Sequence, residues 1–251
     1  MKNLMIYISR TGSFNNPPSN QDSSQLAKIQ IENSLALGWK KEDIMLITNF
    51  DYEYGGIKAT VLKGVDFFEL VPQASKFNAI IKMFENRMIK KNEIYWFHDL
   101  DAYQQVPFIE GEIDLTDADM ALVIYGKQLR WNTGSFFFNS KSKDIFEQTM
   151  QLVYKHKINE EMALTHLTNT NEAFKKIVKS INRTYNFTAF SLKASYYRSI
   201  RPIKVVHFHP NTPHRQMPVN KPLDYFKGNN YIDKPLLTQD LIKLFRYHRI
   251  T

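Results

Sequence analysis

Residues 94–101 read Ile-Tyr-Trp-Phe-His-Asp-Leu-Asp, an apolar run that ends in two acids. Together with Glu93, the apolar part predicts a buried β-strand over 93–98. Side chains two residues apart in an extended chain point to the same side, so Asp99 and Asp101 can converge just past this strand. Two close carboxylates repel each other unless a cation lies between them. The pair therefore indicates a divalent metal site; the alternative is two solvated loop acids.

The rest of the chain alternates in the same way between apolar strands and amphipathic helices. We expect strands at 4–9, 43–49, 118–125, 134–139 and 205–208, and helices at 21–37, 75–88 (with Ser75 as N-cap), 144–155, 160–168 and 238–247. This alternation favours parallel βαβ units. Ligands of such sheets bind beyond the carboxyl ends of the strands. Each polar cluster in this sequence follows an apolar strand, so the clusters are candidates for one site.

The composition narrows the kind of chemistry. The chain has 251 residues, of which 43% are hydrophobic, and it has no cysteine. This length suits one large α/β domain, and the lack of cysteine excludes disulfide scaffolds, cysteine zinc sites and thiol nucleophiles. Acids and histidines are the remaining metal ligands, and they favour Mn²⁺ or Mg²⁺. Without a signal peptide or an apolar run of about 20 residues, we expect a soluble, cytoplasmic protein; a bacterial or viral origin would fit.

Positive charge is concentrated at the carboxyl end. The formal net charge is +8, and residues 201–251 hold nine Lys or Arg against three Asp. Such a segment is either a solvated surface or a face for an anionic partner, for example a nucleotide diphosphate, an acidic glycan or nucleic acid.

Several motifs, in this order, resemble those of the glycosyltransferases with the GT-A fold. Asp-Leu-Asp at 99–101 is similar to their metal-binding Asp-x-Asp, which also follows an apolar strand. The further matches are Ala-Asp-Met-Ala-Leu at 118–122, Asn-Thr-Gly at 132–134, Glu-Glu-Met-Ala-Leu at 160–164, Tyr-Asn at 185–186 and Val-His-Phe at 206–208. The resemblance covers roughly residues 4–210. It implies a GT-A-like α/β fold with a mixed, mostly parallel central sheet flanked by helices.

The resemblance also implies domains and an activity. Residues 1–210 would form the catalytic domain, and residues 211–251 a basic extension that packs on it. The activity would be transfer of a sugar from a UDP- or GDP-sugar to a hydroxyl acceptor such as a glycan, with Mn²⁺ or Mg²⁺ bound by Asp99, Asp101 and His207. In the retaining branch of the family the third ligand usually precedes Gly and Lys-Pro-Trp. Here His209 and Pro210 follow instead, so His209 is a competing ligand.

Further site residues come from the same resemblance. It implies nucleotide contacts at Ser9, Arg10, Thr11, Asp51, Lys76, Asp99 and Leu100, sugar or acceptor contacts at Trp131, Asn132, Thr133 and Gly134, and catalytic acids at Glu160, Glu161 and Asp119. Glu161 stands where the family has an amide, so it could act as a base or a nucleophile, or do neither. Trp131 could equally fill the core, and Asn132 and Gly134 could simply build a turn.

Two other functions remain open from the sequence. The acceptor could be a modified base in DNA, because aromatic residues interleave with basic ones in the segment 215–251. The chain could also be a non-catalytic module that binds a sugar nucleotide or a glycan. That second reading rests on the glutamate at 161 and on the missing Lys-Pro-Trp.

Overall fold

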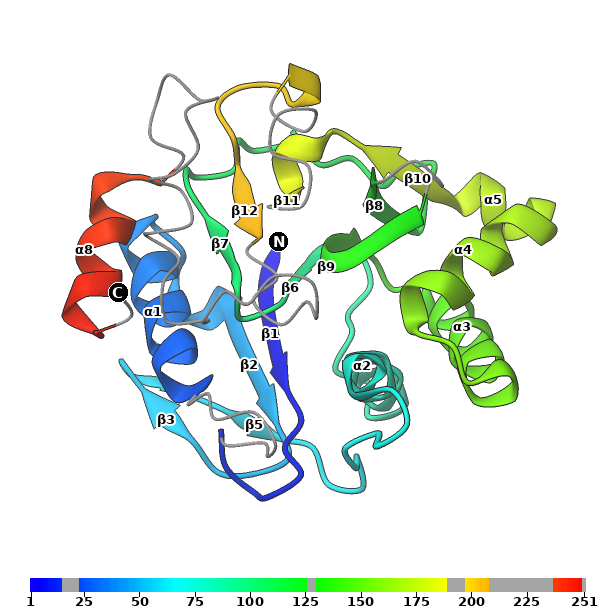
Figure 1. Ribbon diagram of the computed structural model, residues 1–251, viewed down its shortest axis with the longest axis horizontal. Helices are drawn as coiled ribbons and strands as arrows, with labels where there is room; N and C mark the ends of the chain where they lie inside the picture. Colours follow the sequence, from blue (N-terminus) through cyan, green and yellow to red (C-terminus); the bar gives the residue numbers. More distant parts are fainter. Residues whose placement is uncertain (15–22, 126–129, 189–196, 208–236, 250–251) are drawn as a thin grey trace.

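The computed structural model describes residues 1–14, 23–125, 130–188, 197–207 and 237–249 (Figure 1). Its centre is a seven-stranded sheet in the order β10-β8-β9-β6-β1-β2-β5. The strands are β1 (Lys2–Tyr7), β2 (Ile44–Thr48), β5 (Thr60–Val61), β6 (Tyr95–His98), β8 (Met120–Tyr125), β9 (Arg130–Phe138) and β10 (Val178–Ile181). Only β9 runs antiparallel to its two neighbours. The expected mixed, mostly parallel sheet is confirmed.

Helices cover both faces of this sheet. They are α1 (Ser23–Ala36), α2 (Ser75–Glu85), α3 (Lys143–His156), α4 (Glu160–Thr170), α5 (Glu172–Ile177) and α8 (Gln239–Tyr247). Alternate strand residues point to opposite faces, so Leu4 packs with α2, α3 and α4, whereas Met5 packs with α1 and α8. Figure 1 shows the two groups of helices on either side of the strands. The first group contributes Phe77 and Phe146, the second Ile29 and Phe245, and all four are fully buried.

A small second sheet brings distant parts of the chain together. It contains β7 (Ala102–Gln104), β11 (Phe187–Thr188) and β12 (Val205–His207), in the order β11-β12-β7. β12 is antiparallel to β7, with His207 opposite Ala102. His207 therefore lies next to the segment Asp99–Asp101, which joins β6 to β7. A separate hairpin pairs β3 (Glu53–Tyr54) with β4 (Ile57–Lys58).

Some local expectations were wrong. Ser75 does not cap a helix, because the 3₁₀ turn η2 (Pro72–Ala74) continues directly into α2. Its Oγ instead accepts a hydrogen bond from the backbone N–H of Phe68, at 2.8 Å. The strand expected at 134–139 begins earlier, at Arg130. Two other 3₁₀ turns, η1 (Lys41–Asp43) and η3 (Arg183–Tyr185), precede β2 and β11.

The last helix packs on the same core as the first. The rings of Tyr103 and Phe245 meet edge to face at 4.8 Å, and both are buried. Residues 208–236 lie outside the described residues, so the boundary between 1–210 and 211–251 stays a prediction. Among the helices described here, none has the length and apolar character needed to cross a membrane.

Candidate active site

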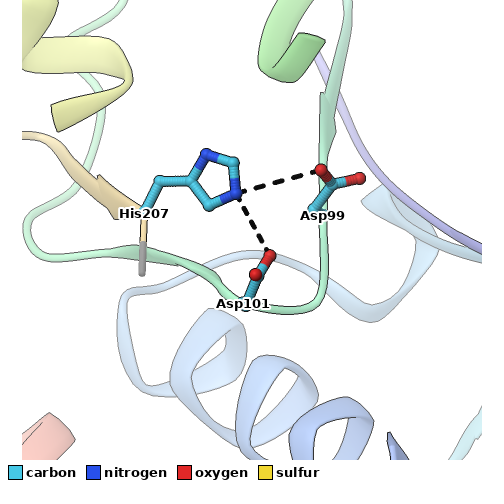
Figure 2. Close-up of side chains that lie close together, drawn as sticks. All are labelled: Asp99, Asp101 and His207. Atoms are coloured by element: carbon cyan, nitrogen blue, oxygen red, sulfur yellow. Dashed lines mark ion pairs between the residues drawn. The ribbon is translucent and has the colours of Figure 1, made fainter. Parts of the chain in front are cut away.

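Two acids and a histidine meet at the carboxyl end of β6. After His98 the chain turns tightly, and the N–H of Ala102 donates to the carbonyl of Asp99 at 3.0 Å. The pairing of β7 with β12 then places His207 across from this turn. Nε2 of His207 lies 3.2 Å from Oδ1 of Asp101 and 3.9 Å from Oδ2 of Asp99 (Figure 2).

This cluster has the ligand set of a divalent metal site. Asp99, Asp101 and His207 each offer one ligand atom, and these atoms lie within 4.8 Å of one another. Carboxylate oxygens and an imidazole nitrogen together suit Mn²⁺, and the oxygens alone suit Mg²⁺. The structure thus brings together all three residues expected to bind metal. His209 lies outside the described residues.

A chain of hydrogen bonds that runs through two asparagine side chains fixes the orientation of the His207 ring. The N–H of Gly134 donates to Oδ1 of Asn132 at 2.8 Å, and Nδ2 of Asn186 donates to the same oxygen at 2.8 Å. Oδ1 of Asn186 therefore faces Nδ1 of His207, at 3.1 Å. An amide oxygen only accepts, so Nδ1 of a neutral His207 carries the proton. The lone pair of Nε2 is then directed at the two carboxylates, as a metal ligand requires.

The charges in the cluster shift its proton affinities. Burial raises the pKa of the Asp99 carboxyl to about 6. The positive charge of Lys76 lowers this pKa, and the negative charge of Asp101 raises it. Burial alone would lower the pKa of His207, but Asp101 and then Asp99 raise it overall. Without a cation Asp99 and His207 therefore retain protons more readily than isolated side chains do. A divalent ion has to displace those protons, which makes binding stronger at higher pH.

Lys76 supplies a buried positive charge beside this cluster. Its Nζ lies 3.2 and 3.3 Å from the two oxygens of Asp99 and 3.4 Å from Oε1 of Glu160. It also lies 5.3 Å from the centre of the Phe97 ring. Burial would lower the pKa of Lys76, but the charges of Asp99 and Glu160 raise it overall. The side chain thus stays charged and links α2 to both acids.

The first turn of α4 directs two more acids inward. Asn159 caps this helix by accepting from the N–H of Met162 at 2.8 Å. Oε1 of Glu160 accepts from the hydroxyl of Thr133 at 2.9 Å. Glu160 is thus buried rather than solvated.

The neighbouring acid, Glu161, is held at both oxygens. Its Oε1 accepts from the N–H of Thr133 at 3.1 Å, and its Oε2 accepts from the hydroxyl of Tyr125 at 2.6 Å. Burial raises the pKa of the Glu161 carboxyl. The carboxylate is therefore fixed in position and has an increased affinity for a proton.

Two buried polar atoms in this region lack a hydrogen-bond partner among the described residues. They are Nδ2 of Asn132 and Oε2 of Glu160. Buried polar atoms in folded proteins are nearly always paired, with protein, water or ligand. One is a donor and the other an acceptor, so a molecule with hydroxyl groups could satisfy both.

A cavity of about 300 Å³ adjoins the metal cluster. It lies between the carboxyl ends of β1 and β6, and its lining includes Tyr7, Phe67, Lys76, Leu100 and Asp101. This is the end of a parallel sheet where ligands bind. The expected nucleotide contacts Lys76, Asp99 and Leu100 all line it.

The loop after β1 is held by its own side chains. Oγ of Ser9 accepts from the N–H groups of Thr11 and Ser13, at 3.0 and 3.1 Å. The N–H of Ser9 donates to Oδ1 of Asn49, at 2.8 Å. Arg10 pairs with Glu69 and lies 5.0 Å from the centre of the Phe67 ring. These contacts give Ser9 a role in building the loop.

Two expected site residues, Asp119 and Trp131, lie elsewhere or face another way. Asp119 precedes β8, and β8 runs in the same direction as β6, because both are antiparallel to β9. Asp119 therefore lies at the amino end of the parallel strands, whereas Asp99 lies at their carboxyl end. Its assignment as a catalytic acid was wrong. Trp131 is buried, and its indole N–H donates to the hydroxyl of Thr168 at 2.8 Å. Of the two roles expected for Trp131, its position fits filling of the core. Asp51 is exposed beyond β2.

Two residues of the site carried no assigned role in the sequence. Tyr125 ends β8 and bonds Glu161, and Asn186 follows η3 and bonds His207. A polar residue at the end of an apolar strand was the available signal for Tyr125. Asn186 belongs to the Tyr-Asn pair at 185–186, but only the three-dimensional structure gives its partner.

Comparison with known proteins supports the fold. No family model and no curated protein sequence matches the chain. Among solved structures, it is similar to the galactosyltransferase LgtC in complex with donor and acceptor sugar analogues, with a TM-score of 0.59 and 14% identity over 98% of this chain and 96% of LgtC. The glycosyltransferase GlyE of Streptococcus pneumoniae TIGR4 gives 0.56 and 13%, over 98% of this chain and 63% of GlyE. The chain thus has the GT-A glycosyltransferase fold.

A third solved structure is also similar to this chain. It is a glycosyltransferase involved in the glycosylation of the major capsid of PBCV-1, with a TM-score of 0.51 and 13% identity over 82% of this chain and 93% of that one. At these identities the likeness establishes the fold, and the activity has to be argued from the site.

Proposed function

We propose that this protein transfers a sugar from a UDP- or GDP-sugar to a hydroxyl acceptor, with Mn²⁺ or Mg²⁺ bound by Asp99, Asp101 and His207. The convergence of these three side chains beside a cavity of about 300 Å³ carries the proposal. When bound, the metal would neutralise the charge of the diphosphate as it leaves.

The cavity next to the cluster is the proposed nucleotide site. Lys76 lines it and places a buried positive charge close to Asp99, where a diphosphate would need one. Ser9, Arg10 and Thr11 form the loop after β1, and we assign nucleotide contacts to this loop. Asp51 stays a proposed contact for the base or ribose.

The donor sugar is proposed to contact Asn132, Thr133 and Glu160. The unpaired donor of Asn132 and the unpaired acceptor of Glu160 support this, because a sugar hydroxyl both donates and accepts. Glu161 is the proposed catalytic base. Its two hydrogen bonds hold the carboxylate still, and its raised pKa suits a group that takes up a proton from the acceptor.

The test is release of nucleoside diphosphate from a panel of UDP- and GDP-sugars, with Mn²⁺ or with EDTA. We expect one donor to be consumed with Mn²⁺ only, and a loss of about 100-fold or more in the Asp99→Asn and Asp101→Asn proteins. The exposed Asp117→Asn serves as the matched control and should keep full activity. Unchanged turnover in both cluster variants would refute the proposal.

The same assay, together with thermal melting of the protein, separates the alternatives that the sequence left open. Transfer that requires duplex DNA and weakens steeply with salt would favour a DNA acceptor. A sugar nucleotide that raises the melting temperature but is never consumed would favour a binding module. A glycan acceptor is the outcome that we propose.

A further inference from the structure

Helix α1 has a row of buried polar residues facing the sheet. Gln30, Asn33 and Ser34 are 1%, 4% and 2% exposed, among apolar neighbours such as Ile29 and Ile31. Burying an amide costs free energy unless both its donors and its acceptor find partners. The partners of these residues therefore indicate what the row does.

Gln30 bonds the backbone on both sides of Asp101. Its Nε2 donates to the carbonyl of Leu100 at 3.0 Å and to the carbonyl of Ala102 at 2.9 Å. Its amide group thus binds the carbonyl oxygens of the two residues that flank the acid. The helix itself is anchored to β1, because Ser34 donates to the carbonyl of Gln30 and accepts from Nδ2 of Asn3, at 2.7 and 2.9 Å.

The residues that Gln30 holds also set the place of His207. Ala102 pairs with His207 across β7 and β12, and Asp101 precedes it in the turn. A shift of this turn would therefore move the Asp101 carboxylate relative to the imidazole, which lies 3.2 Å away. Groups that orient metal ligands in this way commonly change metal affinity when they are removed.

We propose that Gln30 is a positioning residue, which clamps the turn around Asp101 and so sets the affinity of the cluster for a divalent cation. This inference rests on the metal site of the proposed function. Gln30 belongs to α1 and acts through the backbone carbonyls of Leu100 and Ala102.

The chain contains a matched control on the same helix. Asn33 lies one turn further along α1, and its Nδ2 donates to the carbonyl of Gln104 at 2.9 Å. Gln104 is the last residue of β7, two residues beyond Ala102. Asn33→Leu therefore removes a buried hydrogen bond of the same kind, to the same strand, without touching the turn.

The experiment titrates Mn²⁺ alone into the wild-type, Gln30→Met and Asn33→Leu proteins and counts the free ion by electron paramagnetic resonance. Methionine matches glutamine in length but donates no hydrogen bond. We expect Gln30→Met to raise the Kd for Mn²⁺ about 10- to 100-fold. Asn33→Leu should change it less than about twofold, although both variants melt at a lower temperature.

Each result bears on a separate claim. An unchanged Kd in Gln30→Met, or an equal rise in both variants, would overturn the role of Gln30 and leave the proposed function standing. Failure of the wild-type protein to bind Mn²⁺ would overturn both. If Gln30→Met does not fold, Gln30→Leu, which also donates no hydrogen bond, is compared with Asn33→Leu in the same titration.

Discussion

The imidazole ring of His207 packs directly against the backbone of Gly134. A β-carbon placed on Gly134 would overlap this ring. Gly134 lies within β9, where the pairing with β8 is irregular between Leu122 and Val123, and not in a turn. A glycine is thus needed here for space, because any side chain would push a metal ligand away.

Gly134→Ala should therefore damage the metal site. We expect the displaced His207 to weaken Mn²⁺ binding by about 10-fold or more, with a loss of thermal stability. Titration with Mn²⁺ checks the first effect and thermal melting the second. Wild-type affinity in the variant would mean that His207 is not a ligand.

Lys76→Met should strongly destabilise the protein. The substitution leaves Asp99 and Glu160 without their buried partner, which typically costs about 3–5 kcal/mol. Lys82→Met, on the same helix, is the control, because Lys82 forms an exposed ion pair with Glu85 and should cost less than about 1 kcal/mol. Urea unfolding measures both. Equal losses would show that the charge of Lys76 is unimportant for the fold.

Glu161→Gln should raise stability at neutral pH while lowering activity. Burial raises the pKa of Glu161 in the folded protein above its ordinary 4.5, so the unfolded chain loses this proton more readily. The wild-type free energy of unfolding therefore falls as pH rises through the folded pKa. The amide carries no charge and avoids this cost, and Tyr125 can donate to it or accept from it.

Urea unfolding of the Glu161→Gln protein from pH 4 to pH 8 measures the effect. The advantage of the variant should be present at pH 7 and disappear below about pH 4.5. Turnover should fall about 100-fold if Glu161 exchanges a proton during transfer. A gap that is constant with pH would contradict the assignment of a raised pKa.

Phe245→Ala tests whether the C-terminal helix is part of the domain. Phe245 is fully buried against Tyr103, so its truncation should cost about 3–5 kcal/mol. Tyr247, 75% exposed on the same helix, is the control, and Tyr247→Ala should change stability by about 0.5 kcal/mol or less. Similar small effects in both variants would mean that α8 does not contribute to the core.

The sequence predicted the strands of the fold and the two acids of the metal cluster because both follow from local patterns. Apolar runs located the main strands, and the two acids at 99–101 lie directly after one of them. His207 came from the ordered resemblance, since more than a hundred positions separate it from Asp101. What joins them is the register of β7 with β12, two strands of three residues each. Strands of three residues are too short to show a hydrophobic periodicity in the sequence.

The same limit explains the error at Asp119. Its assignment needed the direction of β8 relative to β6, and that direction depends on β9 lying antiparallel between them. Gln30 was missed for a related reason. A glutamine in a helix that contains several other polar residues forms no distinctive pattern, and its role depends on two carbonyl groups about seventy positions away.

Anomalous diffraction at the manganese edge, from crystals soaked in Mn²⁺ and UDP, tests the central claim most directly. The account predicts one peak within bonding distance of Asp99, Asp101 and Nε2 of His207, with the UDP diphosphate on its open side. A peak held by other residues, or UDP bound with no metal between these side chains, would contradict it.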